Sequence, residues 1–259
     1  MAQATGPRRL TRPKWTSGLV GFVVVIGVWE LFTATLASGN RIWPTPWAIV
    51  TLMVSDGWHF YWPNMQTTLW EAMRGFFWGN VLAIGLAMLV LLVPIIERPL
   101  IQLSVVSYCL PIVAVAPIFT ALWSGETPKV LLAAMAVFFT TLIGMLIGLR
   151  SADPTSLDLV YAYGGGAFRK LIKVRLWACL PSLFASLRIA APAAVLGAII
   201  GEYLGGYRGL GVAMIVSEQS LDVARTWGIA LVSTAVGSLG YFLMSTLGRL
   251  LTPWARQTS

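Results

Sequence analysis

The sequence has little charge for its length. Only 11% of its 259 residues are Asp, Glu, Lys or Arg, whereas a soluble domain has about 25%. Hydrophobic residues make up 57% of the chain, and its mean hydropathy is +0.77. The charged side chains of a water-exposed surface are missing, so the composition excludes a soluble globular domain and indicates an integral membrane protein.

Histidine and cysteine are also scarce. His59 is the single histidine, and Cys109 and Cys179 are the two cysteines. Catalytic and metal sites usually draw on clusters of such residues. We therefore expect no catalytic residue, no metal site, no cofactor and no disulfide in this chain, and the same scarcity argues against a membrane-embedded enzyme.

Long apolar blocks are what the chain has instead. A helix needs about 20 apolar residues to cross about 30 Å of hydrocarbon. Six blocks have this character, namely 18–37, 80–96, 100–125, 130–149, 181–206 and 227–248. They predict an all-α membrane protein with six transmembrane helices. We expect a cytoplasmic N-terminal tail at 1–17, one transmembrane domain at 18–255, and a C-terminal tail at 256–259.

The placement of the basic residues predicts the orientation. With both termini in the cytoplasm, twelve of the 18 Lys and Arg residues fall on the cytoplasmic side, and four, Lys129 among them, fall outside. This asymmetry is the positive-inside pattern of bacterial membrane proteins. The net charge of +8 therefore serves topology and contact with anionic lipid, and no nucleic-acid partner is needed to explain it.

The cytoplasmic loop at 151–180 is the longest polar stretch. Asp153 and Pro154 predict the start of a short helix that ends near Tyr163. Three consecutive glycines at 164–166 predict a break, because they disfavour a continuous helix by about 3 kcal/mol. An amphipathic helix over 167–178 is expected to lie on the inner leaflet. Two interpretations remain open, a lipid anchor and a docking surface for a cytoplasmic partner.

Several charged residues fall inside or beside the predicted spans, where charge is costly. Arg188 either reaches the inner surface along its own side chain, or it pairs or lines a pore. Glu202, near the outer end of the fifth span, is expected to pair with Arg74 or Arg208. Glu71 is the other candidate partner of Arg74, three residues away on the same helix.

The third predicted span contains two prolines, Pro111 and Pro117. Backbone groups freed by a proline are tolerated where they face protein or a water-filled cavity. This span is therefore a candidate pore lining, and an ordinary kink in a packed bundle is the alternative.

Several parts of the sequence resemble a known family. One part is the loop stretch 158–164 (DLVYAYG), which is followed after nine residues by 174–177 (VRLW). It resembles the cytoplasmic signature of ABC importer permeases. That signature reads Glu-Ala-Ala, then any three residues, Gly, any nine residues, Ile, any one residue, and Leu-Pro. The spacing matches, and the identities depart from the signature at Asp158, Leu159, Val160 and Trp177. Further motifs are similar to the nitrate, sulfonate and taurine branch, namely LPSLFASLRIA at 180–190, GEYL at 201–204, GLG at 209–211 and WPTP at 43–46.

The resemblance implies a type I ABC importer permease in the bacterial inner membrane. Its expected partners are a second permease subunit, identical or different, two cytoplasmic ATPase subunits that bind ATP-Mg, and an external substrate-binding protein. The solute is expected to be a small anion such as a sulfonate, nitrate or carboxylate, or alternatively a thiamine-precursor pyrimidine or riboflavin.

The resemblance also implies roles for particular residues. Gly209, Leu210 and Gly211 are expected to form a turn near the dock of the binding protein. The residues expected to couple the permease to the ATPase are Asp158, Tyr161, Ala162, Tyr163, Gly164 and Arg169.

A secondary active transporter is the alternative of another class. Such a carrier should show paired broken helices and ion-coordinating carboxylates near the middle of the membrane. Only Glu30 and Glu202 are available for that role, and no second half of the sequence mirrors the first.

Overall fold

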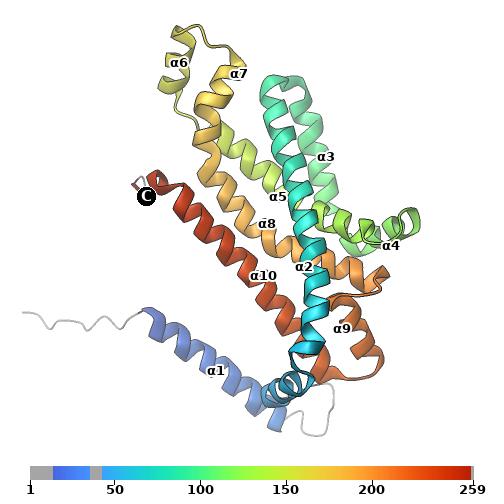
Figure 1. Cartoon of the computed structure of the whole chain (residues 1–259). Helices are drawn as coiled ribbons and strands as arrows, with labels where there is room; N and C mark the ends of the chain where they lie inside the picture. The colour runs from blue at the N-terminus through green and yellow to red at the C-terminus, as the bar shows by residue number, and fades with distance from the viewer. Residues whose placement is uncertain (1–13, 36–42, 258–259) are drawn as a thin grey trace, which may run out of the picture.

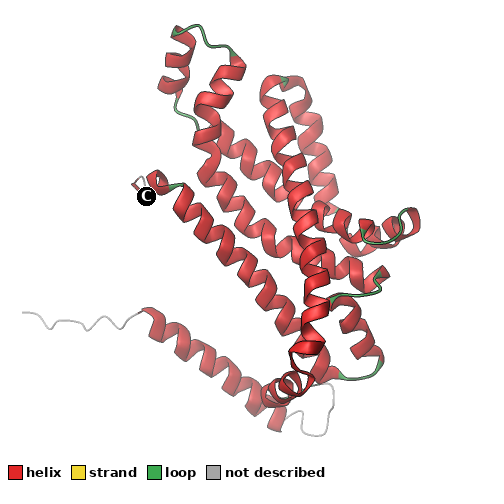
Figure 2. Ribbon diagram, in the orientation of Figure 1, coloured by secondary structure: helices red, strands yellow, loops and turns green. Residues whose placement is uncertain are grey.

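The computed structural model describes residues 14–35 and 43–257, and its regular structure in these ranges is helical throughout (Figures 1 and 2). The helices in chain order are α1 (Lys14–Thr35), α2 (Pro46–Leu92), α3 (Glu97–Cys109), α4 (Ile112–Leu122), α5 (Thr127–Arg150), α6 (Pro154–Ala162), α7 (Ala167–Lys170), α8 (Leu176–Gly205), α9 (Leu210–Gln219) and α10 (Val223–Leu251). Short 3₁₀ turns cover Pro94–Ile96 and Pro253–Gln257.

Four helices are long and apolar enough to cross a membrane, namely α2, α5, the continuous segment Ala167–Gly205 that contains α8, and α10. The pair α3 and α4 gives a fifth span if the two are taken together. The first predicted span overlaps α1, a helix of 22 residues that is not among the spans found in the described residues. The described residues thus support a multi-pass membrane protein with four or five spans, and a sixth stays a prediction.

The third predicted span is not one straight helix. Leu110 and Pro111 are extended, with ψ values of 123° and 118°, and α3 and α4 meet there at 96°. Proline disfavours the helical conformation of the residue before it and lacks its own N–H, so the helix breaks at Pro111. Pro117 lies inside α4 and does not end it.

The loop between α5 and α8 has the predicted short helix and the predicted break. Asp153 caps α6 by accepting a 3.0 Å hydrogen bond from the Ser156 amide, and Gly164 has a φ of +72°. The prediction of a separate amphipathic helix over 167–178 is wrong. A π-helical turn, Leu171–Arg175, joins α7 to α8 without interruption. Pro181 lies inside α8, because one proline removes a single hydrogen bond and need not end a helix.

The segment at 38–66, which lies between the first two apolar blocks, is mostly helical in its described part. Its residues 38–42 lie outside the described residues, and α2 begins at Pro46 with Thr45 as its N-cap. Gly57, with φ 65° and ψ 175°, breaks α2 into two parts. The longer part continues to Leu92 as the first helix of the bundle.

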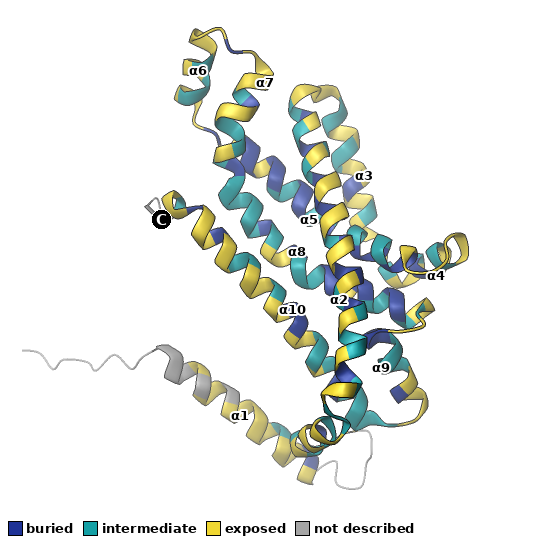
Figure 3. Ribbon diagram, in the orientation of Figure 1, coloured by how far each residue is buried: buried dark blue, intermediate teal, exposed yellow. Residues whose placement is uncertain are grey.

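Helix α5 lies at the centre of the bundle, between α2 and α8 (Figure 3). Small residues allow the close approach, as in other membrane bundles. A Cβ atom added to Gly75 of α2 would lie 2.3 Å from the Ala133 Cβ, and one added to Gly144 of α5 would lie 2.5 Å from the Ser186 Cβ. Helices α6 and α7 lie at one end of the molecule and α9 at the other (Figure 1). We call these the α6 end and the α9 end.

Candidate functional site

Three charged side chains are buried together near the α9 end. Glu71 of α2 is 0% exposed, Glu202 of α8 is 1% exposed and Lys129 of α5 is 4% exposed. The Lys129 Nζ lies 3.1 Å from Glu71 Oε1. Burying charge is tolerated only with paired and hydrogen-bonded groups, so the arrangement ties three helices together. We call Glu71, Lys129, Glu202 and the neighbouring Thr68 the buried polar cluster.

Glu202 joins this cluster to the start of α9. Its Oε1 accepts a 2.7 Å hydrogen bond from the Thr68 hydroxyl, and its Oε2 accepts a 2.7 Å hydrogen bond from the Gly211 amide. The Leu210 amide in turn donates to the Thr68 oxygen at 2.9 Å. Helix N-termini leave amides without helical partners and favour negative charge. Glu202 therefore caps α9 from another helix.

Glycine is required at the turn before α9. Gly209 has a φ of +123°, and a Cβ atom there would lie 2.1 Å from the Glu202 carboxylate. The predicted turn of Gly209, Leu210 and Gly211 is thus a helix start built around Glu202. A contact between this turn and Glu202 was not predicted from the sequence.

The predicted ion pairs of this region are wrong. Glu202 contacts neither Arg74 nor Arg208 among the hydrogen bonds and ion pairs of the described residues, since its two oxygens face Thr68 and Gly211. Arg74 pairs with Glu126 rather than with Glu71. The reason is that Glu71 faces the bundle interior, whereas the Arg74 side chain is 44% exposed.

Sequence reasoning missed Thr68 and the burial of Lys129. Lys129 was counted with the external basic residues, yet it lies in the first turn of α5 and is buried. Thr68 and Glu71 are three residues apart on one helix, so they share a face. That polar face inside an apolar helix is the sequence feature that could have indicated the buried polar cluster.

The residues predicted to couple to an ATPase lie at the α6 end. Asp158, Tyr161 and Ala162 are exposed on α6, Tyr163 and Gly164 are exposed just after it, and Arg169 is exposed on α7. Lys170 Nζ lies 4.8 Å from the centre of the Tyr161 ring, which is cation–π distance. Backbone and side-chain hydrogen bonds from Ser156 lower the pKa of Asp153 from its usual value.

Arg188 and the two prolines lie elsewhere. Arg188 is exposed on α8, and it lines a cavity of about 280 Å³ between α8 and α10. Pro111 and Pro117 are both exposed, at the bend before α4 and within it. The structure therefore does not bring these candidates into one site with the buried polar cluster. Glu30 of α1 is also exposed.

The apolar spans of the described residues identify the class, a multi-pass membrane protein. Residues 79–257 match the family model described as "Binding-protein-dependent transport system inner membrane component". The match covers more than half of the chain, which therefore belongs to this family of ABC transporter permease components.

Individual relatives agree with this assignment. The chain is 30% identical over 227 residues to a probable ABC transporter permease protein of Haemophilus influenzae, covering 86% of this chain and 91% of the relative. It is 28% identical to the formylaminopyrimidine transport permease ThiX of Halalkalibacterium halodurans, covering 91% and 94%. It is 26% identical to the putative aliphatic sulfonates transport permease SsuC of Bacillus subtilis, covering 93% and 88%. A riboflavin transport system permease, RibX of Chloroflexus aurantiacus, is also similar.

Proposed function

We propose that this chain forms the membrane pathway of an ATP-driven importer, together with a second permease subunit. An external binding protein delivers the solute to the α9 end. Cytoplasmic ATPase subunits, which bind ATP-Mg, act on the α6 end, and both chain termini lie in the cytoplasm. The support is membership of the binding-protein-dependent transport family and the permease names of the relatives.

The observation that carries the proposal is the exposed apolar surface of the α6 end. Leu159 is 59% exposed, Tyr161 70% and Tyr163 82%. These residues belong to a polar loop outside the spans, where large apolar side chains are costly to leave in water, and such patches mark protein interaction sites. A partner that covers them explains why α6 stands away from the bundle (Figure 1).

We propose that the solute is a small anion of the sulfonate, nitrate or carboxylate kind. The names of the relatives include sulfonates, a formylaminopyrimidine and riboflavin, so they do not single out one solute. The cavity beside Arg188 favours the anion, because the Arg188 guanidinium lines it.

The test is whether the ATPase subunits co-purify with the permease when α6 is changed. Leu159→Glu places a charge on the exposed apolar surface and should abolish co-purification, while the permease still inserts and elutes as a single species. Ala167→Glu makes a comparable apolar-to-acidic change at an exposed position beyond the glycine break, and should retain the ATPase. Equal retention by both variants would contradict docking through α6.

A further inference from the structure

The two flanks of the α8–α10 pair differ in chemistry. The two helices run antiparallel and lie against each other, since a Cβ atom added to Gly248 would lie 2.9 Å from Phe184 and one added to Gly237 would lie 3.4 Å from Pro192. On the flank shared with α2, a cavity of about 230 Å³ is lined only by apolar residues and glycine, including Leu69, Phe76, Leu239 and Leu243. We call it the apolar groove.

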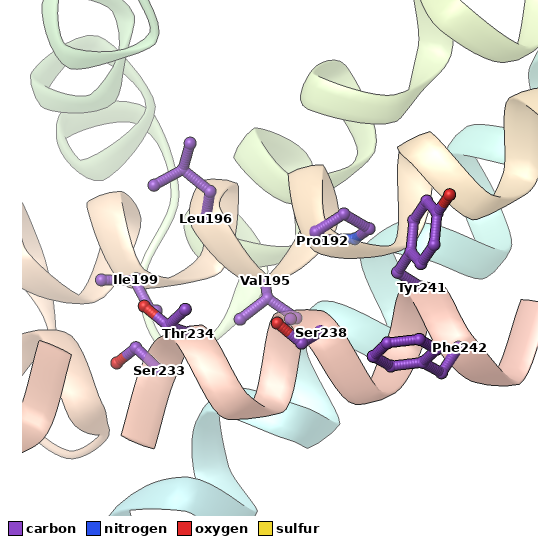
Figure 4. Close-up of a pocket in the computed structure, with 10 residues that line it drawn as sticks. Pro192, Val195, Leu196, Ile199, Ser233, Thr234, Ser238, Tyr241 and Phe242 are labelled. Carbon is purple, nitrogen blue, oxygen red and sulfur yellow. The ribbon is translucent and has the colours of Figure 1, made fainter. Parts of the chain in front are cut away.

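The other flank carries a row of polar side chains. Thr234, Ser238, Tyr241 and Ser245 of α10 follow one another at intervals of four, three and four residues, so they share one face of the helix. Cavities of about 480 Å³ and about 280 Å³ lie along this face. Figure 4 shows the larger one, which is lined by Thr234, Ser238 and Tyr241 of α10 and by Val195 of α8. We call this flank the polar groove.

These hydroxyls are not used to hold the subunit together. Thr234, Ser238 and Tyr241 are exposed, and the hydrogen bond of Thr234 goes to the Ala230 carbonyl of its own helix. Polar groups in membrane helices face another protein surface or a water-filled cavity rather than lipid. The polar groove is therefore the flank of the α8–α10 pair that faces water or a second subunit.

Arg188 lies at the α6-end half of this groove. It forms no ion pair among the described residues, whereas Arg74 of α2 and Lys129 of α5 each have a carboxylate partner. Fourteen residues separate it from Glu202 on α8, a rise of about 21 Å. It thus lies within the apolar helical segment Ala167–Gly205, where an unpaired charge is expensive and marks a solute pathway or relay. Ser245 lines the same cavity.

We propose that the cavity beside Arg188 is an oxyanion subsite on the solute pathway. The guanidinium N–H groups of Arg188 donate to the sulfonate, carboxylate or phosphate group of a passing solute, for which their planar fork is suited, and the Ser245 hydroxyl adds a donor. This inference rests on the proposed function, since only a permease has a solute pathway. The headgroup of an anionic lipid offers the same chemistry and is the competing occupant.

The test uses the assembled transporter in phosphatidylcholine nanodiscs. Cys109→Ser and Cys179→Ala remove the native thiols, and Ser245→Cys places a thiol in the cavity. Two probes of opposite charge are compared, 2-sulfonatoethyl and 2-(trimethylammonium)ethyl methanethiosulfonate. Each forms a mixed disulfide with the thiolate and releases methanesulfinate, and mass spectrometry follows the added mass. The measured quantity is the ratio of the labelling rate of the sulfonate probe to that of the cationic probe. This ratio should be roughly five- to tenfold higher with Arg188 than in the Arg188→Gln variant, because one positive charge several ångströms away attracts the first probe and repels the second.

Three controls make the outcome decisive. Arg188→Lys keeps the charge and should keep the preference for the sulfonate probe. Leu243→Cys, in the apolar groove, should react with neither probe. Replacing a third of the lipid by phosphatidylglycerol should leave the preference unchanged. An equal preference in Arg188→Gln, or no labelling of the Ser245→Cys variant by either probe, would overturn the subsite.

The experiment with phosphatidylglycerol distinguishes the two candidate occupants of the cavity, a solute and a lipid headgroup. If phosphatidylglycerol lowers the preference to the level of Arg188→Gln, a lipid headgroup fills the site and the assignment to the solute pathway is overturned. Labelling requires neither ATP nor a bound ATPase. Retention of the ATPase by Leu159→Glu, equal to that by Ala167→Glu, would therefore contradict the proposed function without changing this result, and the two proposals fail separately.

Discussion

The charged and polar residues of the α9 end and of the α6 end are held in opposite ways. Near α9, Glu71, Lys129 and Glu202 are at most 4% exposed and bind one another or neighbouring backbone. At the α6 end, Tyr161 and Tyr163 are at least 70% exposed, and α6 packs mainly on its neighbour α7. The first region joins four helices, and the second is attached through a short connection at each side.

This difference assigns different physical tasks to the two ends. Removing one member of a buried ion pair leaves an uncompensated charge in a low-dielectric interior, so the α9 end should respond to substitution through stability. Exposed residues contribute little to stability, so the α6 end should respond through its partner. Substitutions ordered by their expected effect on stability test this division.

Lys129→Met should give the largest loss of stability. The substitution keeps an unbranched side chain of similar shape and removes the charge that faces Glu71 at 3.1 Å. Breaking a buried pair from one side costs about 3–5 kcal/mol. We expect a lower yield of monodisperse protein and a clearly lower Tm in detergent, measured by size-exclusion chromatography after heating.

The double variant Lys129→Met with Glu71→Leu is the matched control. Replacing both members of a buried pair by apolar residues is often neutral, so the double variant should recover most of the lost Tm. If Lys129→Met alone is as stable as the unmodified protein, the buried polar cluster does not hold the α9 end together.

How much of this comparison is visible in the sequence depends on the range of the interactions. The blocks 130–149 and 227–248 fall within α5 and α10, because an uninterrupted apolar run of that length has no other stable arrangement in lipid. The loop features were predictable for a similar reason. The cap at Asp153 and the break at Gly164 are local properties of a few adjacent residues.

The buried polar cluster could not be predicted in the same way. Thr68 and Glu202 are 134 residues apart in sequence, and their contact depends on how α2, α5 and α8 pack. A kink in this span was one of the two alternatives, but the complete break at Pro111 could not be predicted, because the same proline can kink a helix or end it according to its neighbours. Sequence reasoning thus identified the charged residues but not their partners.

Gly164→Leu should have a smaller effect on stability and a large effect on transport. A leucine at a φ of +72° is strained by roughly 1–3 kcal/mol, although its Cβ would meet no other atom within 4 Å. We expect normal insertion and a small change in Tm, with loss of substrate-stimulated ATPase activity and of uptake in proteoliposomes. The reason is that the strain changes the angle at which α6 leaves the bundle.

Gly166→Leu is the control for Gly164→Leu. Gly166 has a φ of −78° and a Cβ there would also meet no atom within 4 Å, so the same side chain is added without backbone strain. It should retain coupling, and Gly164→Asn, which tolerates a positive φ, should retain part of it. Full coupling in Gly164→Leu would refute a role for this glycine in transmitting movement.

Asp153→Ala should give the smallest change in global stability, confined to the first turn of α6. It removes the acceptor of the Ser156 amide at 3.0 Å, so hydrogen exchange of the first α6 amides should accelerate while the Tm stays within error.

Because Ser156 lowers the pKa of Asp153, the ionised cap stabilises the folded loop above the usual pKa of the side chain. This contribution is lost as the pH falls through the lowered folded-state pKa. Asp153→Asn keeps a capping oxygen without a titrating group, so its exchange should stay slow at neutral pH and lose the acid-dependent acceleration. Fast exchange in Asp153→Asn at neutral pH would show that the charge, rather than the hydrogen bond, holds the start of α6.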